Sequence, residues 1–143
     1  MAWRLDASGT IFADTSGLFA LAVRGDQHFR AAQELQRTFI VARTQLLTTN
    51  FVLAELHALM LSRVGIPEGN QLLDSIERSR TLIERASVVD EERARDIIRK
   101  YADHGYSLTD AISFAMMDRL GIRRAFTFDE HFARYGVTIP VEV

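Results

Sequence analysis

Residues 10–22, Thr-Ile-Phe-Ala-Asp-Thr-Ser-Gly-Leu-Phe-Ala-Leu-Ala, contain the pattern that decides the fold. The apolar run from Thr10 to Ala13 has the length of a buried strand, and the stretch from Ser16 to Ala22 that follows it predicts a short helix. Short apolar runs alternate with helical patterns along the rest of the chain in the same way. This alternation is typical of βαβ units, whose strands form a parallel sheet covered by helices.

The other predicted elements follow one another without linkers or internal repeats. Further strands are expected at residues 45–48, 82–89 (broken by Glu84-Arg85), 124–127 and 137–139. Further helices are expected at residues 27–38, 51–64, 66–79, 90–102 and 109–120, with a turn of helix at 130–134 and Asp90 as a cap. Together they predict one three-layer α/β/α domain over residues 1–143, with a polar leader at residues 1–10 and a central, mostly parallel sheet of about five strands.

Composition excludes several classes of protein. The chain has 143 residues, enough for one domain with a proper core. The absence of cysteine excludes disulfides, zinc–thiolate sites and thiol nucleophiles. No apolar stretch approaches the roughly 18 residues of a membrane span, and no signal-peptide pattern is present, so a cytoplasmic protein without membrane association is expected. With a net charge of −2, the composition does not indicate a nucleic-acid binder.

Four acidic residues are unusual because each lies next to an apolar stretch. Asp14 ends the run 11–13, Glu55 lies inside an apolar helix, Asp110 opens another helix, and Asp129 follows the run 125–128. A buried charge without a partner costs several kcal/mol, and no Lys or Arg is adjacent in sequence to any of the four. If the fold brings these acids together, a divalent cation is the simplest counter-charge.

The predicted fold places these acids near one edge of the sheet. Ligand sites in open α/β sheets form outside the carboxyl ends of the strands. Asp14 and Asp129 come just after predicted strands, and Asp110 begins a helix whose dipole favours an anion. Glu55 lies one turn into the helix that follows the second strand. We therefore expect three of the four at the same edge and Glu55 close to it.

Each acid also has a purely structural interpretation. Asp14 could cap the helix that follows it, and Ser107 to Asp110 has the spacing of a capping box. Asp129 could belong to a turn, and Glu55 would be ordinary on an exposed helix face.

Two histidines lie close to these acids in sequence. His57 follows Glu55 and His131 follows Asp129, each by two residues. A general-acid or metal-ligand role is open to both, although lone histidines are more often structural or exposed.

The same residues resemble the PIN domain family, most closely its VapC-type toxin endoribonucleases. The resemblance covers residues 11–141 and rests on four motif elements in order: Phe-Ala-Asp-Thr-Ser at 12–16, Glu55 in an apolar helix, Leu-Thr-Asp-Ala at 108–111, and Thr-Phe-Asp-Glu-His-Phe at 127–132. The last element matches the Thr-x-Asp-x-x-Phe pattern of the family at every fixed position. Any one element is a weak signal, whereas four in order are a strong one.

The resemblance implies specific site residues and partners. It implies a catalytic and metal-binding quartet of Asp14, Glu55, Asp110 and Asp129, holding Mg²⁺ or Mn²⁺. It implies support by hydrogen bonds from Ser16 and Thr127. It further implies an Mg²⁺- or Mn²⁺-dependent ribonuclease, a hydrolase acting on RNA phosphodiester bonds, as the toxin of a type II toxin–antitoxin pair. The expected partners are RNA, an antitoxin protein and a second copy of the chain in a homodimer.

Two alternative functions belong to other classes of protein. One is a PIN-like RNA- or protein-binding module with little or no catalysis, although such a module has no reason to keep four mutually repelling acids. A phosphotransfer enzyme using an acceptor Asp is disfavoured, because residues 14–16 lack a second Asp two positions on. If RNA is the substrate, phosphate contacts are expected from arginines near the site, with Arg24, Arg43 and Arg123 as candidates.

Overall fold

The structure is a computed structural model that describes residues 3–4 and 9–142. Its strands are β1 (Trp3–Arg4), β2 (Thr10–Ala13), β3 (Gln45–Thr49), β4 (Leu82–Glu84), β5 (Ala125–Phe126) and β6 (Val141–Glu142). Its helices are α1 (Thr15–Ala22), α2 (Phe29–Val41), α3 (Asn50–Arg63), α4 (Ile66–Arg78), α5 (Val88–Lys100), α6 (Leu108–Leu120) and α7 (Glu130–Tyr135).

The central sheet has four parallel strands in the order β4-β3-β2-β5. Phe12 in β2 is paired with Leu47 in β3 on one side and with Ala125 in β5 on the other. The chain thus builds outward from β2 to β3 and β4, then returns to place β5 on the opposite side of β2. Between β2 and β5 the direction of winding reverses, which is where open α/β sheets bind ligands. Apart from this sheet, β1 pairs antiparallel with β6.

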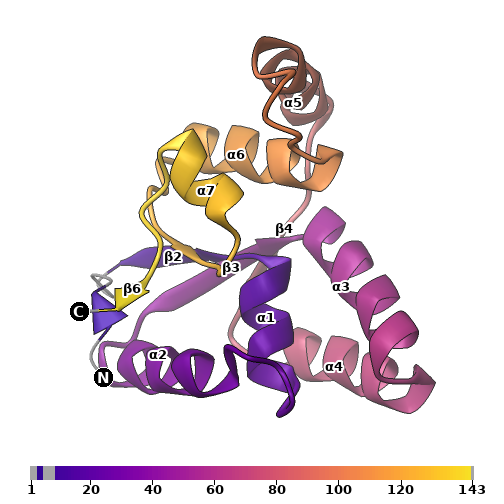
Figure 1. Cartoon of the computed structure of the whole chain (residues 1–143), viewed down its shortest axis with the longest axis vertical. Coiled ribbons are helices and arrows are strands. Elements are labelled where there is room, and N and C mark those ends of the chain that lie inside the picture. Colours follow the sequence, from indigo (N-terminus) through magenta and orange to yellow (C-terminus); the bar gives the residue numbers. More distant parts are fainter. Residues whose placement is uncertain (1–2, 5–8, 143) are drawn as a thin grey trace.

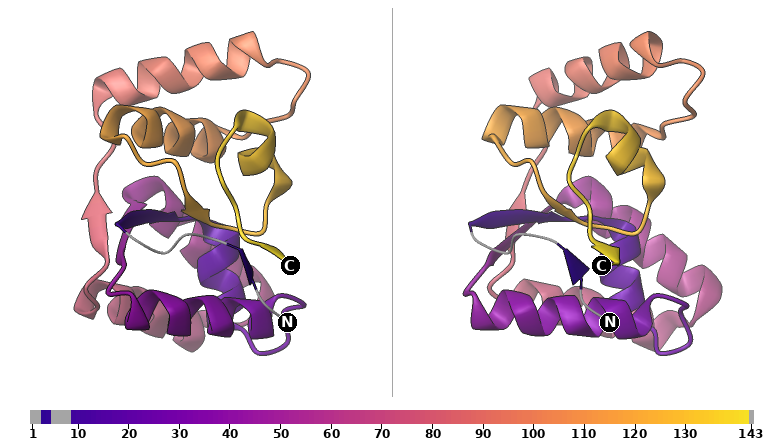
Figure 2. Two further views of the ribbon diagram at one scale, coloured as in Figure 1. Left: turned by 90° about the vertical axis from the view of Figure 1, so that its left-hand side faces the viewer. Right: turned by 60° about the vertical axis from the view of Figure 1, so that its left-hand side comes forward.

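Helices cover both faces of the sheet (Figure 1, Figure 2). α6 and α7 lie on one face with α5 packed on the outside of α6, while α1 and α2 lie on the other face and α4 packs against α3. The central strand is covered on both sides, because Ile11, Phe12 and Ala13 are all fully buried. A strand of this kind reads as a continuous apolar run rather than an alternating one. The predicted three-layer α/β/α architecture is confirmed.

Two predicted strands differ from the structure. The strand expected at residues 82–89 ends at Glu84, because Ser87 caps α5 and forms a capping box with Asp90, which is therefore not itself the cap. The strand expected at 137–139 is reduced to a single parallel bridge between Thr138 and Arg124. The parallel sheet accordingly has four strands instead of about five.

Two further expectations concern the N-terminal leader and membrane association. Within the predicted leader, Trp3–Arg4 forms β1, whereas residues 1–2 and 5–8 lie outside the described residues. Over the part of the chain that the structure describes, no helix has the length and apolar character needed to cross a membrane.

Candidate active site at the carboxyl edge of the sheet

Two neighbouring strand ends bring Asp14 close to the segment that follows β5. Asp14 comes directly after β2, and residues 127–129 come directly after β5. The two ends are joined by a backbone hydrogen bond from Asp14 N–H to the Phe126 carbonyl oxygen, at 3.1 Å. Gly17 permits this approach, because a Cβ atom there would lie 2.3 Å from the same carbonyl oxygen. The first turn of α1 therefore rests directly on the end of β5.

Two hydroxyl groups hold the Asp14 carboxyl group in place. Thr127 Oγ1 donates to Asp14 Oδ2 at 2.9 Å, and Ser16 Oγ lies 3.2 Å from the same oxygen and 2.9 Å from Thr127 Oγ1. The hydroxyl oxygens also accept backbone hydrogen bonds, Ser16 from Phe128 N–H and Thr127 from Asp129 N–H. These are the hydrogen bonds that the resemblance implies for Ser16 and Thr127, and they tie β2 to the chain that carries Asp129.

Asp110, Asp129 and His131 form a second group at the same edge. Asp110 is the third residue of α6, and its Oδ2 accepts hydrogen bonds from Ser107 N–H at 3.2 Å and from His131 Nδ1, at 3.0 Å, when that nitrogen carries the proton. Asp129 caps α7 by accepting from His131 N–H at 2.9 Å, and its Oδ1 lies 3.7 Å from His131 Nδ1. One possible ligand atom from each of the three residues lies within 4.8 Å of the others.

The pKa of Asp14 shows that the two groups act on each other. This pKa is raised from 3.8 to about 7, mainly by burial and to a smaller extent by the charges of Asp110 and Asp129. The hydrogen bonds from Thr127 and from the Thr15 backbone oppose the rise. Asp14 is only 3% exposed, and no Lys or Arg within the described residues forms an ion pair with any of the three acids. Within the described residues, the site is thus a cluster of carboxyl groups whose one basic neighbour is the His131 imidazole.

Asp14 lies near enough to Asp110 and Asp129 for their charges to raise its pKa, whereas no interaction among the described residues links Glu55 to the other three acids. Glu55 lies in α3, which packs against α1 and α6, the helices that follow Asp14 and contain Asp110. Its side chain is half-buried beside the buried residue Leu56 and makes no hydrogen bond or ion pair among the described residues. Its helix adjoins the site, but contact between Glu55 and the site stays a prediction.

The structural interpretations of the acids have different outcomes. The Asp14 side chain makes no capping hydrogen bond, so capping does not explain it. Asp110 does form the capping box with Ser107 and lies in the cluster as well, so the two interpretations hold together. Asp129 is the N-cap of α7.

The two histidines have different roles. His57 Nε2 lies 2.9 Å from Asn70 Oδ1 and links α3 to α4, as a structural histidine would. His131 lies with Asp110 and Asp129 in the acidic cluster. This is the less common of the two roles that the sequence analysis considered for a lone histidine. The sequence signal for this role is the position of His131 two residues after Asp129. The contact with Asp110, which is 21 residues away in the chain, has no local signal.

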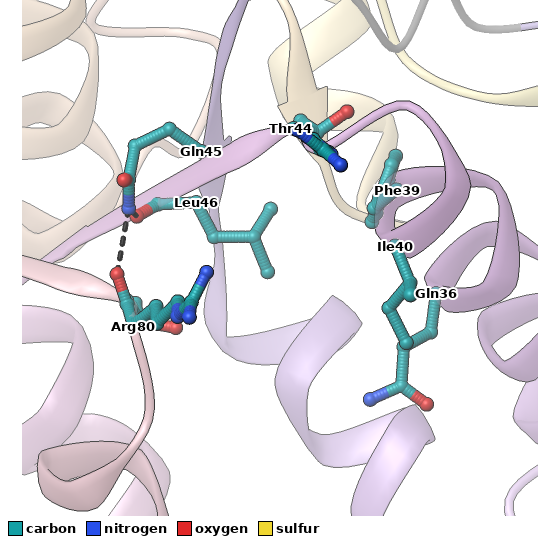
Figure 3. Close-up of a pocket in the computed structure, with 9 residues that line it drawn as sticks. Gln36, Phe39, Ile40, Thr44, Gln45, Leu46 and Arg80 are labelled. Atoms are coloured by element: carbon teal, nitrogen blue, oxygen red, sulfur yellow. Dashed lines mark hydrogen bonds between the residues drawn. The ribbon is translucent and has the colours of Figure 1, made fainter.

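Two of the arginines proposed as phosphate contacts lie at the opposite edge of the sheet. Arg43 and Arg123 precede β3 and β5, so they are at the amino ends of the strands, and that expectation was wrong for both. Arg43 helps to line a cavity of about 720 Å³ at this edge, together with Arg80, Phe39 and Leu46 (Figure 3). Among its lining residues, the Gln45 side chain donates to the Arg80 carbonyl oxygen at 2.7 Å. It shares no residue with the acidic cluster.

Comparison with known proteins finds similarity to one protein family over most of the chain. The PIN domain family matches residues 11–137. The 23S rRNA-specific endonuclease VapC20 of Mycobacterium tuberculosis, from strains CDC 1551 / Oshkosh and ATCC 25618 / H37Rv, is 31% identical over 130 residues that cover 88% of this chain and 94% of the relative. The crystal structure of Mycobacterium tuberculosis VapC20, a sarcin–ricin loop cleaving toxin, matches with a TM-score of 0.83 and 29% identity, over 90% of this chain and 96% of that one.

Proposed function

Since this chain belongs to the PIN domain family, we propose that it is a metal-dependent endoribonuclease and the toxin of a type II toxin–antitoxin pair. The observation that carries the proposal is the convergence of Asp14, Asp110 and Asp129 at the sheet's switch point without a Lys or Arg partner among the described residues. Repelling carboxylates in a buried place are costly to a stable fold. They are explained if the site holds a divalent cation.

The donor set fits Mg²⁺ or Mn²⁺. Both ions prefer carboxylate oxygen and water as ligands, and the site offers three carboxylates. A bound divalent ion would supply an activated water and neutralise charge that develops on the phosphoryl and leaving oxygens. We propose Asp14 and Asp110 as main direct ligands. Asp129 and Glu55 complete the quartet directly, through water, or by orienting the attacking water.

The side chains around the quartet keep its oxygens in position. The hydroxyls of Thr127 and Ser16 both act on Asp14 Oδ2, which fixes the plane of that carboxylate. The capping box holds Asp110 in the first turn of α6, at the positive end of the helix dipole. Because Asp14 has a pKa of about 7 in the absence of a cation, cation binding is expected to release a proton from it near neutral pH.

The proposed substrate and partners follow from the relatives. VapC20 is described as specific for 23S rRNA and as cleaving the sarcin–ricin loop, so this stem-loop is the first RNA that we propose as a substrate. We also propose an antitoxin protein as a partner, a homodimer as the assembly, residues 1–143 as a single domain, and the cytoplasm as the place of action.

The test is cleavage of a panel of RNAs, including 23S rRNA and its sarcin–ricin loop, with Mg²⁺, Mn²⁺ or EDTA. Metal-dependent cleavage by the wild type is expected, with loss in the Asp14→Asn and Asp110→Asn variants. Asp74→Asn, which changes an exposed carboxylate on α4, is the matched control and should cleave normally. Cleavage that survives both site substitutions would refute the assignment. Metal binding without cleavage of any RNA would favour a binding module.

A further inference from the structure

His131 approaches two of the acids through one ring nitrogen. Its Nδ1 lies 3.0 Å from Asp110 Oδ2 and 3.7 Å from Asp129 Oδ1. In an octahedral site with bonds of about 2.1 Å, adjacent ligand atoms are about 3.0 Å apart and opposite ones about 4.2 Å. The 3.0 Å separation matches two adjacent ligands of one ion, and the 3.7 Å separation lies between the adjacent and opposite values. The Nδ1 atom is therefore within the range in which the three residues could hold one ion.

The ring of His131 is held in this orientation by its surroundings. The Tyr106 ring packs edge-on against it with centroids 5.4 Å apart, and Tyr106 in turn packs against Phe114 of α6. The backbone N–H of His131 donates to Asp129 Oδ1, so the side chain begins beside that carboxylate. A histidine placed for packing alone has no need to direct a nitrogen between two acids.

The ligand atoms that an ion needs remain available around Nδ1. The hydrogen bonds of Asp110 and Asp129 involve one oxygen of each carboxylate, Oδ2 and Oδ1 respectively, and the second oxygens have no partner among the described residues. His131 Nε2 likewise has no hydrogen-bond partner in the described part of the chain, and the side chain is 32% exposed. The tautomer with the proton on Nε2, which coordination through Nδ1 requires, can thus be hydrated by solvent.

We propose that His131 Nδ1 is a direct ligand of the divalent ion and makes this site select Mn²⁺, or another borderline transition metal, over Mg²⁺. This inference rests on the proposed function, since it concerns the ion of the same site. Imidazole nitrogen suits transition metals, whereas Mg²⁺ prefers oxygen donors and water. A site made of carboxylates alone would not discriminate in this way, and His131 adds the discriminating atom.

Binding and spectroscopy of the purified protein test the proposal without any RNA. Isothermal titration should show Mn²⁺ binding tighter than Mg²⁺ by about tenfold or more. In the His131→Asn variant, Mn²⁺ affinity should fall by about tenfold, while Mg²⁺ affinity should change by less than about threefold, because an amide oxygen can replace nitrogen for Mg²⁺. Pulsed electron paramagnetic resonance of bound Mn²⁺ should show coupling to a histidine nitrogen in the wild type and not in the variant.

The control variant is His57→Asn, because His57 is a half-buried histidine that bonds Asn70 away from the cluster. It should keep the Mn²⁺ preference and the nitrogen coupling. Loss of Mn²⁺ binding in Asp14→Asn and Asp110→Asn, but with no nitrogen coupling in the wild type and no effect of His131→Asn, would overturn the role of His131 while sparing the nuclease. Absence of divalent-ion binding to the wild type would overturn both.

Discussion

Asp14 makes the stability of the metal-free protein depend on pH. Burial, with the charges of Asp110 and Asp129, raises its pKa from 3.8 to about 7 in the folded state, whereas in the unfolded chain it returns to its ordinary value. Between these two values the folded state holds a proton that the unfolded state has released. The contribution of Asp14 to the free energy of unfolding therefore falls as pH rises from about 4 to about 7.

Replacement of this carboxyl group by an amide should remove that dependence. At about pH 8, Asp14→Asn should raise the free energy of unfolding of the metal-free protein by on the order of 2–4 kcal/mol, because the buried amide cannot ionise. Urea unfolding in EDTA between about pH 5 and pH 8 measures the effect, with Asp74→Asn as control. An unchanged pH slope in the Asp14→Asn variant would show that another group is responsible.

Two buried threonines beside the site offer a matched pair of substitutions. Thr127 Oγ1 donates to Asp14 and accepts from Asp129 N–H, whereas Thr15 Oγ1 is buried without a partner among the described residues. Thr127→Val should lower the free energy of unfolding by about 1–3 kcal/mol and reduce cleavage, while Thr15→Val should leave stability unchanged or raise it slightly. Thermal unfolding and RNA cleavage assays of both variants measure these effects. Equal effects of the two would mean that the hydroxyl network does not support the site.

At the scale of elements, the contact of α1 with β5 depends on a residue without a side chain. A Cβ atom at Gly17 would lie 2.3 Å from the Phe126 carbonyl oxygen and 3.0 Å from the Phe126 ring. Gly17→Ala should therefore push α1 away from the strand end and lower the free energy of unfolding by about 1–3 kcal/mol, with weaker metal binding. Gly25→Ala is the control, since nothing lies within 4 Å of the Cβ atom it would add. Urea unfolding and metal titration of both variants test this, and a fully stable Gly17→Ala protein would contradict the packing described.

Local sequence patterns predicted strands and helices correctly where only one pattern, such as an apolar run or a helix cap, was present. The run from Ile11 to Ala13 has no competing signal and is a strand as expected. The strand predicted at residues 82–89 includes Val88 and Val89, but the capping box of Ser87 with Asp90 starts α5 at Val88. Both valine side chains are exposed, so burial does not favour a strand at these residues. The hydrogen bonds of the cap stabilise the helix instead.

The site could be predicted from sequence only as far as local signals reach. Asp14 and Asp129 follow strands, and the end of a strand can be predicted from the end of its apolar run. The contact between His131 and Asp110 instead depends on α7 packing against α6, through Phe132 beside Phe114 and the Tyr135 ring stacked on Phe114. That packing is a property of the tertiary structure, and a pattern within a single element does not reveal it.

At the scale of the whole molecule, strand order brings together acids that are far apart in the sequence. β2 and β5 are neighbours although more than a hundred residues separate them, and the reversal of winding between them leaves a place that no crossover helix covers. The arginine-lined cavity lies at the opposite edge. A positively charged pocket and a negatively charged cluster are thus kept at opposite ends of the same strands.

Metal binding should therefore stabilise the whole domain, because the site is assembled only when the sheet is folded. An ion that binds the folded protein alone, at about 100 times its Kd, adds about 2.7 kcal/mol, equivalent to a rise in Tm of about 8 °C for a domain of this size. The rise should be greater at about pH 8 than at about pH 5, since Asp14, with its pKa of about 7, must lose its proton to bind. Thermal unfolding with Mn²⁺, Mg²⁺ or EDTA measures it; Asp14→Asn and Asp110→Asn should abolish the rise and Asp74→Asn should keep it. Equal rises in all three variants would place the bound ion outside this edge of the sheet.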